Sequence, residues 1–339
     1  MAQASSHAVA AQRSKEIESR CGAGPIWDAT SGIGADSLAV ALNGRRVWSS
    51  DRDPRTLAFA RANLEHGGLA AKCFVADATT HPLKELPAGV LVDPDRRPGG
   101  RRSLDPRRWS PTLEQSLRLA DRVGAACLKL PPAFEANQLG DERAATTELT
   151  WLSWRGELAA VDAWCGSWAG QQSSPGREAL AIDRNGTVAR FAGQPEAVEP
   201  LAATEARAIS WLANPDPALV RAGLLGTLAK REDMAPIAPS IGFLGGEQPA
   251  RSGLLRCWRV LEAVSLDRKH IRRALGEHGI GPIQVLKRGH PDSAEVLARR
   301  FRGPGNKPGW LAVARLERGH LGFVLEAPVA EPASGLESS

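Results

Sequence analysis

The sequence predicts an α/β protein of two domains, in which a doubly wound parallel sheet precedes a smaller α/β domain. Short apolar runs alternate with helical stretches from about residue 25 to residue 181, in the order typical of a parallel sheet. A second alternation of this kind begins near residue 200. The length of 339 residues also exceeds that of a usual single domain.

In the first domain, each expected strand is an apolar run that ends in a turn. Strands are expected at residues 25–29, 46–50, 72–76, 89–92 and 125–130, and helices at about 35–42, 54–65 and after residue 111. Pro54 suits a first helical turn, because its missing N–H has no intrahelical partner there. The runs 148–154 and 158–164, joined by Arg155-Gly-Glu157, predict an antiparallel hairpin at the edge of the sheet.

The second domain is expected to begin with a helical stretch at about 202–230. Strands follow at 254–264 and 282–286, helices at 268–276 and 293–302, and a closing hairpin at 311–316 and 321–325. The predicted organisation is an N-terminal arm (1–22), a first domain (23–195), a second domain (200–326) and a disordered tail (327–339).

Composition excludes several classes of protein. With 42% hydrophobic and 24% charged residues and no apolar run of about 18 residues, the chain is expected to be soluble and to contact no membrane. The five cysteines are odd in number and far apart, which predicts free thiols in the cytoplasm and neither a disulfide framework nor a metal site. A net charge of +5 fits either a solvated surface or contact with nucleic acid. Nothing in the pattern indicates an oligomeric state.

A glycine-rich turn between the first strand and its helix is the strongest local signal for a ligand. It reads Asp28-Ala-Thr30-Ser-Gly32-Ile-Gly34-Ala-Asp36. Its glycines let the backbone approach a ligand, and the helix N-terminus offers unpaired N–H groups to a pyrophosphate or a carboxylate. A dinucleotide fingerprint needs a third glycine at position 37, which is serine, so an NAD site is disfavoured. Asp28 and Asp36 suit a ligand that carries an ammonium group.

Two further strand ends carry aspartates. Asp51 ends the second strand, where a carboxylate accepts hydrogen bonds from ribose hydroxyls, although a surface or helix-capping role is the alternative. Asp53, directly before Pro54, is the better capping candidate. Asp77-Ala78 ends the third strand, where the carboxylate would meet an adenine amino group.

Residues 28–63 resemble motifs I and post-I of the class I S-adenosylmethionine (SAM)-dependent methyltransferases, whose catalytic sheet is Rossmann-like. The resemblance implies that SAM is the cofactor. It implies the following binding residues: Asp28, Thr30, Gly32, Gly34, Asp36, Asp51, Asp77 and Ala78.

The fourth strand ends in Asp93-Pro94-Asp95-Arg96-Arg97, the place of motif IV in class I enzymes and the predicted catalytic segment. In amino-methylating enzymes this motif is Asn/Asp-Pro-Pro-aromatic, and its side-chain oxygen and next carbonyl hold an exocyclic amino group in line with the methyl group. Here Asp95 replaces the second proline and Arg96 the aromatic residue, which leaves the target atom open.

The same segment, with Trp109-Ser-Pro111 downstream, is similar to bacterial class I methyltransferases that have a C-terminal THUMP-like domain. Lys129-Leu-Pro-Pro, Gly156-Glu-Leu, residues 214–222 and Lys287-Arg-Gly289 also match that family, so the resemblance covers about residues 28–325. The chain departs from it before motif I, where relatives have a longer helical segment, so substrate docking by such a segment cannot be inherited.

An arginine-rich stretch follows the catalytic segment. Arginines 96, 97, 101, 102, 107 and 108 suit phosphate contacts and stacking on bases, or ion pairs with Asp95 and Asp105. Trp109 is either a stacking platform for a flipped base or a core residue. We therefore expect a SAM-dependent methyltransferase that acts on RNA, with an amino group of a base as the favoured target. The alternatives are a small-molecule or protein methyltransferase, and a non-catalytic RNA-binding module with a SAM-type fold.

Overall fold

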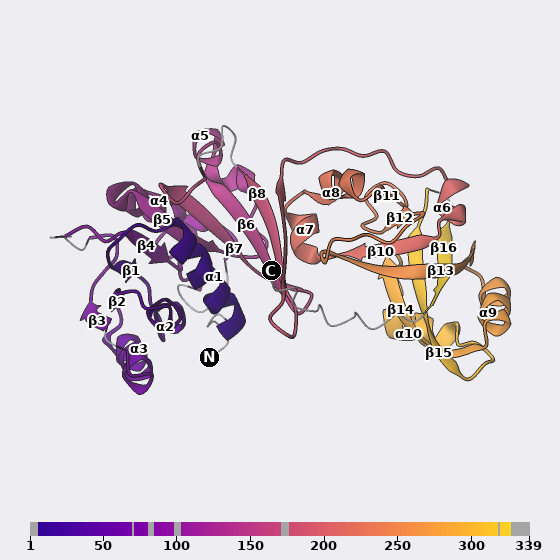
Figure 1. The fold of residues 1–339 in the computed structure, drawn as a ribbon, viewed down its shortest axis with the longest axis horizontal. Helices are drawn as coiled ribbons and strands as arrows, with labels where there is room; N and C mark the ends of the chain where they lie inside the picture. The colour runs from indigo at the N-terminus through magenta and orange to yellow at the C-terminus, as the bar shows by residue number, and fades with distance from the viewer. Residues whose placement is uncertain are drawn as a thin grey trace, which may run out of the picture. The chain divides into compact units, whose positions relative to one another are not determined.

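The computed structural model describes residues 6–69, 71–80, 85–97, 103–170, 176–317 and 319–326, and it confirms the predicted α/β class (Figure 1). The chain forms two compact units. The first contains residues 1–194 and 217–222, and the second contains residues 195–216 and 223–339. The expected tail, 327–339, lies outside the described residues. No helix in the described part of the chain is long and apolar enough to cross a membrane.

The first unit is built on a nine-stranded sheet in the order β3-β2-β1-β4-β5-β7-β6-β8-β9. The five strands β1–β5 are parallel to one another, as predicted. The strands are β1 (Ile26–Asp28), β2 (Val47–Asp51), β3 (Ala71–Val75), β4 (Gly89–Val92), β5 (Ala125–Leu130), β6 (Glu148–Trp154), β7 (Glu157–Gly166), β8 (Arg177–Ile182) and β9 (Val188–Gly193).

The expected antiparallel hairpin is present as β6 and β7, but the expectation that it forms the edge of the sheet was wrong. Strand β7 lies between β5 and β6, and β6 pairs in parallel with β8, which then pairs with β9. Strands β8 and β9 were not expected from the sequence. Their pairing joins segments that a polar stretch separates along the chain, and periodicity within one segment cannot reveal it.

Helices cover both faces of this sheet. They are α1 (His7–Arg20), α2 (Ala35–Leu42), α3 (Pro54–His66), α4 (Leu113–Val123), α5 (Asp141–Ala144) and α7 (Pro217–Arg221). Helix α1 packs on α2, and α2 packs on α3; their core includes Ile17, Val40 and Leu64 beside Leu91 of β4. Because side chains alternate along a strand, Val90 and Val92 face the opposite side, where α4 contacts β4 and β5. Asp53 caps α3 by accepting a hydrogen bond from the N–H of Arg55.

The segment expected as an arm is an integral part of this unit. Helix α1 buries its polar residues Arg13, Ser14 and Glu16 together with Ile17. The Ser14 hydroxyl donates to the carbonyl of Ala39, and Arg13 forms ion pairs with Asp36 (2.5 Å) and Asp162 (2.9 Å). Because polar side chains interrupt the apolar residues on the buried face, α1 has no continuous apolar stripe, and the hydrophobic pattern does not reveal its burial.

The second unit is a seven-stranded sheet in the order β11-β12-β10-β13-β16-β15-β14. Its strands are β10 (Trp211–Pro215), β11 (Ala235–Pro236), β12 (Leu244–Gly246), β13 (Leu255–Ser265), β14 (Ile280–Arg288), β15 (Lys307–Arg315) and β16 (His320–Leu325). Its helices are α6 (Glu205–Ala208), α8 (Leu225–Arg231), α9 (Arg268–Glu277) and α10 (Ala294–Arg300). Helices α9 and α10 contact one side of the sheet, around Ile271, Leu297 and Val313.

The helical stretch expected at 202–230 was wrong. Strand β10 lies within it and pairs with β12 and β13. Pro215 and Pro217 lack the N–H that a helix interior needs, so they divide the stretch into short elements. Helix α7, which follows them, contacts β6 and β8 and belongs to the first unit.

The burial of Arg13 generates a stability prediction. Arg13→Met should destabilise the first unit by about 3–5 kcal/mol, because it leaves the buried carboxylate of Asp162 without its cation and removes the nearer of the two cations beside Asp36. Denaturant unfolding followed by tryptophan fluorescence measures the change. Arg118→Met is the matched control: Arg118 and its partner Glu114 are about three-quarters exposed, so its cost should stay within about 0.5 kcal/mol. Equal effects of the two substitutions would contradict the structural role of Arg13.

Candidate active site

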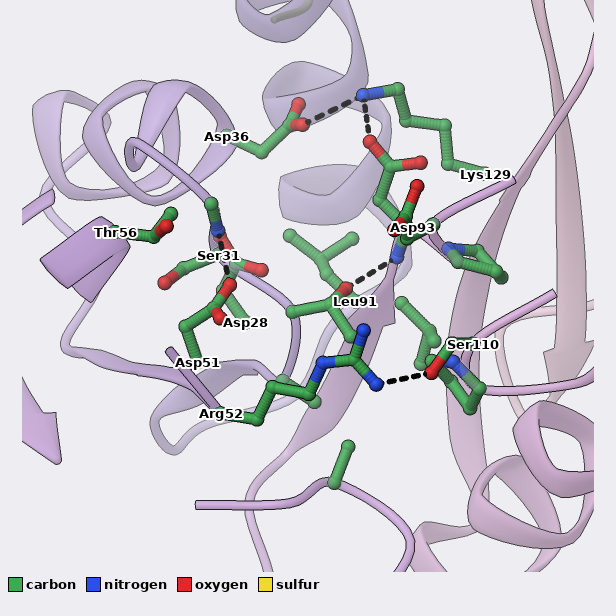
Figure 2. A pocket seen from close by; sticks show the side chains of 18 of the residues that line it. Asp28, Ser31, Asp36, Asp51, Arg52, Thr56, Leu91, Asp93, Ser110 and Lys129 are labelled. Atoms are coloured by element: carbon green, nitrogen blue, oxygen red, sulfur yellow. Dashed lines mark hydrogen bonds and ion pairs between the residues drawn. The ribbon is translucent and has the colours of Figure 1, made fainter. Parts of the chain in front are cut away.

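A cavity of about 560 Å³ opens at the carboxyl ends of β1, β2 and β4 (Figure 2). Parallel strands place their carboxyl ends along one edge of a sheet, so loops that are distant in sequence meet there. The cavity collects most of the predicted site residues: Asp28, Thr30, Gly32, Asp36, Asp51, Asp77, Ala78, Asp93, Pro94, Asp95 and Arg96. Two predicted residues, Gly34 and Arg97, are not among the residues that line it.

The glycine turn leaves room for a ligand. Gly32 has a φ of +55°, and a Cβ built on it would point into open space. Gly34 has a φ of +83°, and its Cβ would lie 2.9 Å from that of Ala60, so this position needs glycine for packing against α3. The Ser31 hydroxyl lines the cavity and is buried without a hydrogen-bond partner in the described structure. An unpaired buried hydroxyl beside an open turn fits a polar ligand in contact with this loop.

Asp51 holds the glycine turn against the end of β2. One carboxylate oxygen accepts a hydrogen bond from the N–H of Gly32 (3.0 Å), and the other accepts one from the N–H of Asp53 (2.9 Å). Asp77 accepts two hydrogen bonds from Thr79, which lower its pKa. Both carboxylates lie at the cavity wall, at the ends of adjacent strands.

Asp28 lies at the floor of the site and is almost fully buried. Burial, and then the neighbouring carboxylate of Asp36, raises its pKa to about 7, although the Ser37 hydroxyl donates to it at 2.6 Å. A cation placed beside the Asp28 carboxyl group would stabilise its ionised form.

Two basic residues that the sequence analysis did not place in the site connect its carboxylates. The Lys129 ammonium, at the end of β5, donates to Asp93 at 2.5 Å and lies 3.6 Å from Asp36. Arg13 joins Asp36 to Asp162 of β7. Figure 2 shows the carboxylates of Asp36 and Asp93 pointing toward the same ammonium. The family match at Lys129-Leu-Pro-Pro could have indicated that Lys129 belongs to the site. No sequence pattern indicated a role for Arg13.

The loop that follows β4 is held at its base by contacts with the segment Trp109-Ser-Pro111. Asp95 and Ser110 exchange two backbone hydrogen bonds, and the guanidinium of Arg52 donates to the Ser110 hydroxyl at 2.6 Å. Trp109 is buried and donates its indole N–H to the carbonyl of Ser103, so it is a core residue and not a stacking platform. The N–H of Asp93 donates to Thr30 Oγ1 at 2.6 Å, which ties this strand end to the glycine turn.

The arginines of this loop have different surroundings. Arg107 is 88% exposed and pairs with Asp105, as the alternative interpretation expected. Arg97 donates its backbone N–H to Asp95, and Arg96 lines the cavity. Arg101 and Arg102 lie outside the described residues.

The charge of the cavity selects a class of ligand. Among the described residues that line it are seven aspartates and four basic residues, Arg13, Arg52, Arg96 and Lys129. An excess of carboxylates repels a pyrophosphate and favours a ligand with cationic groups. The same residues include no group of three or more histidine, cysteine, aspartate or glutamate side chains able to hold a metal ion, and none occurs elsewhere in the described chain.

Comparison with known sequences gives a relative that matches most of the chain. Over 95% of the chain it is 30% identical to an S-adenosylmethionine-dependent methyltransferase of Mycobacterium tuberculosis, and the match covers 85% of that protein. An RNA methyltransferase of Parasynechococcus marenigrum is 40% identical over 79 residues, which are 22% of this chain and 17% of that protein. A family model described as THUMP domain-like matches residues 255–327.

A solved structure has the same fold. A Porphyromonas gingivalis protein described as a methyltransferase superposes with a TM-score of 0.67, covering 97% of this chain and 82% of that one. At 18% identity, this likeness concerns the fold alone.

The geometry of Asp51 generates a binding prediction. Asp51→Ala should lower SAM affinity roughly tenfold or more, because charge-assisted hydrogen bonds are worth about 1.5–3 kcal/mol. Asp51→Asn is the control: it retains an oxygen for the Gly32 N–H and should bind SAM more tightly than the alanine variant. Calorimetry measures both affinities, and parental binding by Asp51→Ala would remove Asp51 from the cofactor site.

The raised pKa of Asp28 generates a pH prediction. A cationic ligand binds the ionised carboxylate better, so SAM affinity should fall as pH decreases below about 7, by at most tenfold per pH unit. An α-amino group titrates at about 8 or above, so the ammonium group of the ligand stays protonated below pH 7. Asp28→Asn should remove the pH dependence between about pH 5.5 and 7.5 in the same calorimetric titration. A pH dependence equal to that of the parent would assign it to another group.

Proposed function

The chain belongs to the SAM-dependent methyltransferases, and we propose that its methyl acceptor is RNA, with an exocyclic amino group of a base as the target. Its cofactor is SAM. The cavity fits that cofactor: Ser31 offers an unpaired hydroxyl, the turn at Gly32 leaves space, and the aspartates suit its two cationic centres.

The observation that carries the RNA proposal is the distribution of charge. Residues 255–327 hold 14 lysines and arginines against 7 aspartates and glutamates, a net charge of +7, whereas the whole chain has +5. The positive charge is therefore concentrated in the THUMP-like segment, and the rest of the chain is slightly acidic. Polyanions bind such a segment by releasing counterions. The similarity to an RNA methyltransferase over 79 residues supports the same acceptor.

Different cavity residues would bind the two substrates, SAM and the methyl acceptor. Asp51 would accept hydrogen bonds from the ribose hydroxyls, Asp77 one from the adenine amino group, and Asp28 and Asp36 would face the ammonium group. When bound, SAM supplies an electrophilic methyl group on a sulfonium. Asp93 and the carbonyl of Pro94 would hold the acceptor amine by its N–H groups and direct its lone pair. Arg52 and Arg96, at the same cavity, would offer guanidinium groups to the RNA.

The alternative acceptors, a protein or a small molecule, lack a supporting observation of this kind. The five free cysteines also fit a reducing cytoplasm, where RNA is available. The contacts of Asp93 argue against a non-catalytic module. Its backbone is bonded to Thr30 of the glycine turn and its carboxylate is paired with Lys129, so it is held where an acceptor would meet the methyl group of SAM.

The proposal is tested by transfer of labelled methyl groups to RNA. The parent should label RNA from total cellular extracts, and digestion to nucleosides should give a base methylated on its amino group. Asp93→Ala should bind SAM with parental affinity but lower the transfer rate by about two orders of magnitude, the usual cost of losing a positioning group. Labelling of protein or a small molecule, with none of RNA, would overturn the RNA acceptor. Full activity of Asp93→Ala would overturn the role of the segment that follows β4.

A further inference from the structure

Lys129 is a buried cation at the point where the two proposed subsites meet. Its side chain is 16% exposed, and its ammonium contacts Asp93 on the acceptor side and lies near Asp36 on the cofactor side. Burial alone would lower the pKa of Lys129, but the two carboxylates outweigh this effect and raise the pKa above its ordinary value. The lysine is therefore charged at neutral pH, and its charge is balanced locally.

We propose that Lys129 is a positioning residue for methyl transfer, which holds the Asp93 carboxylate in one orientation through Asp93 Oδ2. This role rests on the proposed function, because Asp93 is its target. A carboxylate on a strand end can rotate about its side-chain bonds, and an ammonium that also faces Asp36 fixes one rotamer. The backbone of Asp93 is already fixed, since its N–H donates to Thr30 Oγ1. With the ammonium on Oδ2, the other oxygen is left to face the acceptor.

The ion pairs that hold Lys129 in place continue into the core. Asp36, on the first turn of α2, is paired with Arg13 of α1, and Arg13 is paired with Asp162 of β7. Arg13 and Asp162 are almost fully buried, and Lys129 is largely so, so an unpaired charge is costly at each of them. A displacement of Lys129 would remove the ion pair with Asp93, whereas Asp36 would keep its pair with Arg13 and so stays in place to hold the ammonium. The ammonium is therefore a rigid support, and a small misplacement of a reacting group can slow catalysis about a hundredfold.

A positioning role differs from proton transfer in what arginine can replace. Arginine keeps a cationic donor but does not give up its proton in proteins. Lys129→Arg should therefore recover most of the rate that Lys129→Met loses if the residue only positions Asp93. If lysine instead accepted the proton of a hydroxyl acceptor, the arginine variant would be as slow as the methionine variant.

The experiment measures steady-state methylation of the RNA that the parent labels, with SAM affinity and thermal unfolding measured on each full-length variant. Lys129→Met should lower kcat about 10- to 100-fold and leave the KM for RNA and the SAM affinity within about threefold of the parent. Lys129→Arg should return kcat to within about fivefold. Lys230→Met, which removes an exposed lysine paired with Glu196, is the control and should be parental in every measurement.

The outcomes separate this proposal from the function on which it rests. If the parent labels no RNA, the proposed function fails, and the same variants are compared on the acceptor that the parent does label. A parental kcat for Lys129→Met would overturn the positioning role, and so would an arginine variant that folds and binds SAM but stays as slow as Lys129→Met. Should Lys129→Met unfold, Lys129→Gln takes its place: it removes the charge and shortens the side chain by one atom, so it should lower kcat with unchanged KM, and a parental kcat would overturn the positioning role.

Discussion

The buried guanidinium of Arg13 is the interaction on which the first unit depends. It lies between Asp36 and Asp162, which come from α2 and β7, and it is carried by α1. Burial opposes its charge, but the two carboxylates outweigh that effect and raise its pKa well above the ordinary value. Because a charge in the protein interior is tolerated only with partners in contact, the three elements are fixed relative to one another. The helix that precedes motif I is therefore part of the catalytic unit.

Ion pairs connect Arg13 to the candidate active site, because basic and acidic side chains alternate from Arg13 to Asp93. Asp36 faces Lys129, and Lys129 holds Asp93, so the chain ends at the segment that follows β4. A second set of contacts ties that segment to the glycine turn and to the end of β2: the N–H of Asp93 donates to Thr30, and the guanidinium of Arg52 donates to Ser110. The turn at Gly32 and the end of β4 are thus supported from two directions. Two substrates that react by direct transfer need this kind of rigid relative placement.

In the second unit, the segments around Asn214 and Arg288 contact each other. The guanidinium of Arg288 at the end of β14 donates to Asn214 in β10, 3.0 Å away, and lies over the ring of Phe243. Burial lowers the pKa of Arg288. The two segments that resemble the THUMP-like family therefore meet in space, although 74 residues separate them. This contact gives Asn214 and Arg288 a structural role.

The sequence by itself determined the α/β class, the parallel strands β1 to β5, the glycine turn at Gly32 and the segment Asp93–Arg97. Each of these is a contiguous pattern, in which neighbouring residues share one strand or one turn. The tertiary structure alone decided that β7 lies inside the sheet, that β8 and β9 extend it, that Trp109 is buried, and that Arg13 and Lys129 support the site. These features depend on contacts between distant residues, such as the 149 positions between Arg13 and Asp162. A buried charge in a polar helix looks like a surface charge until its partners are known, because burial is a property of the packed chain and not of the local pattern.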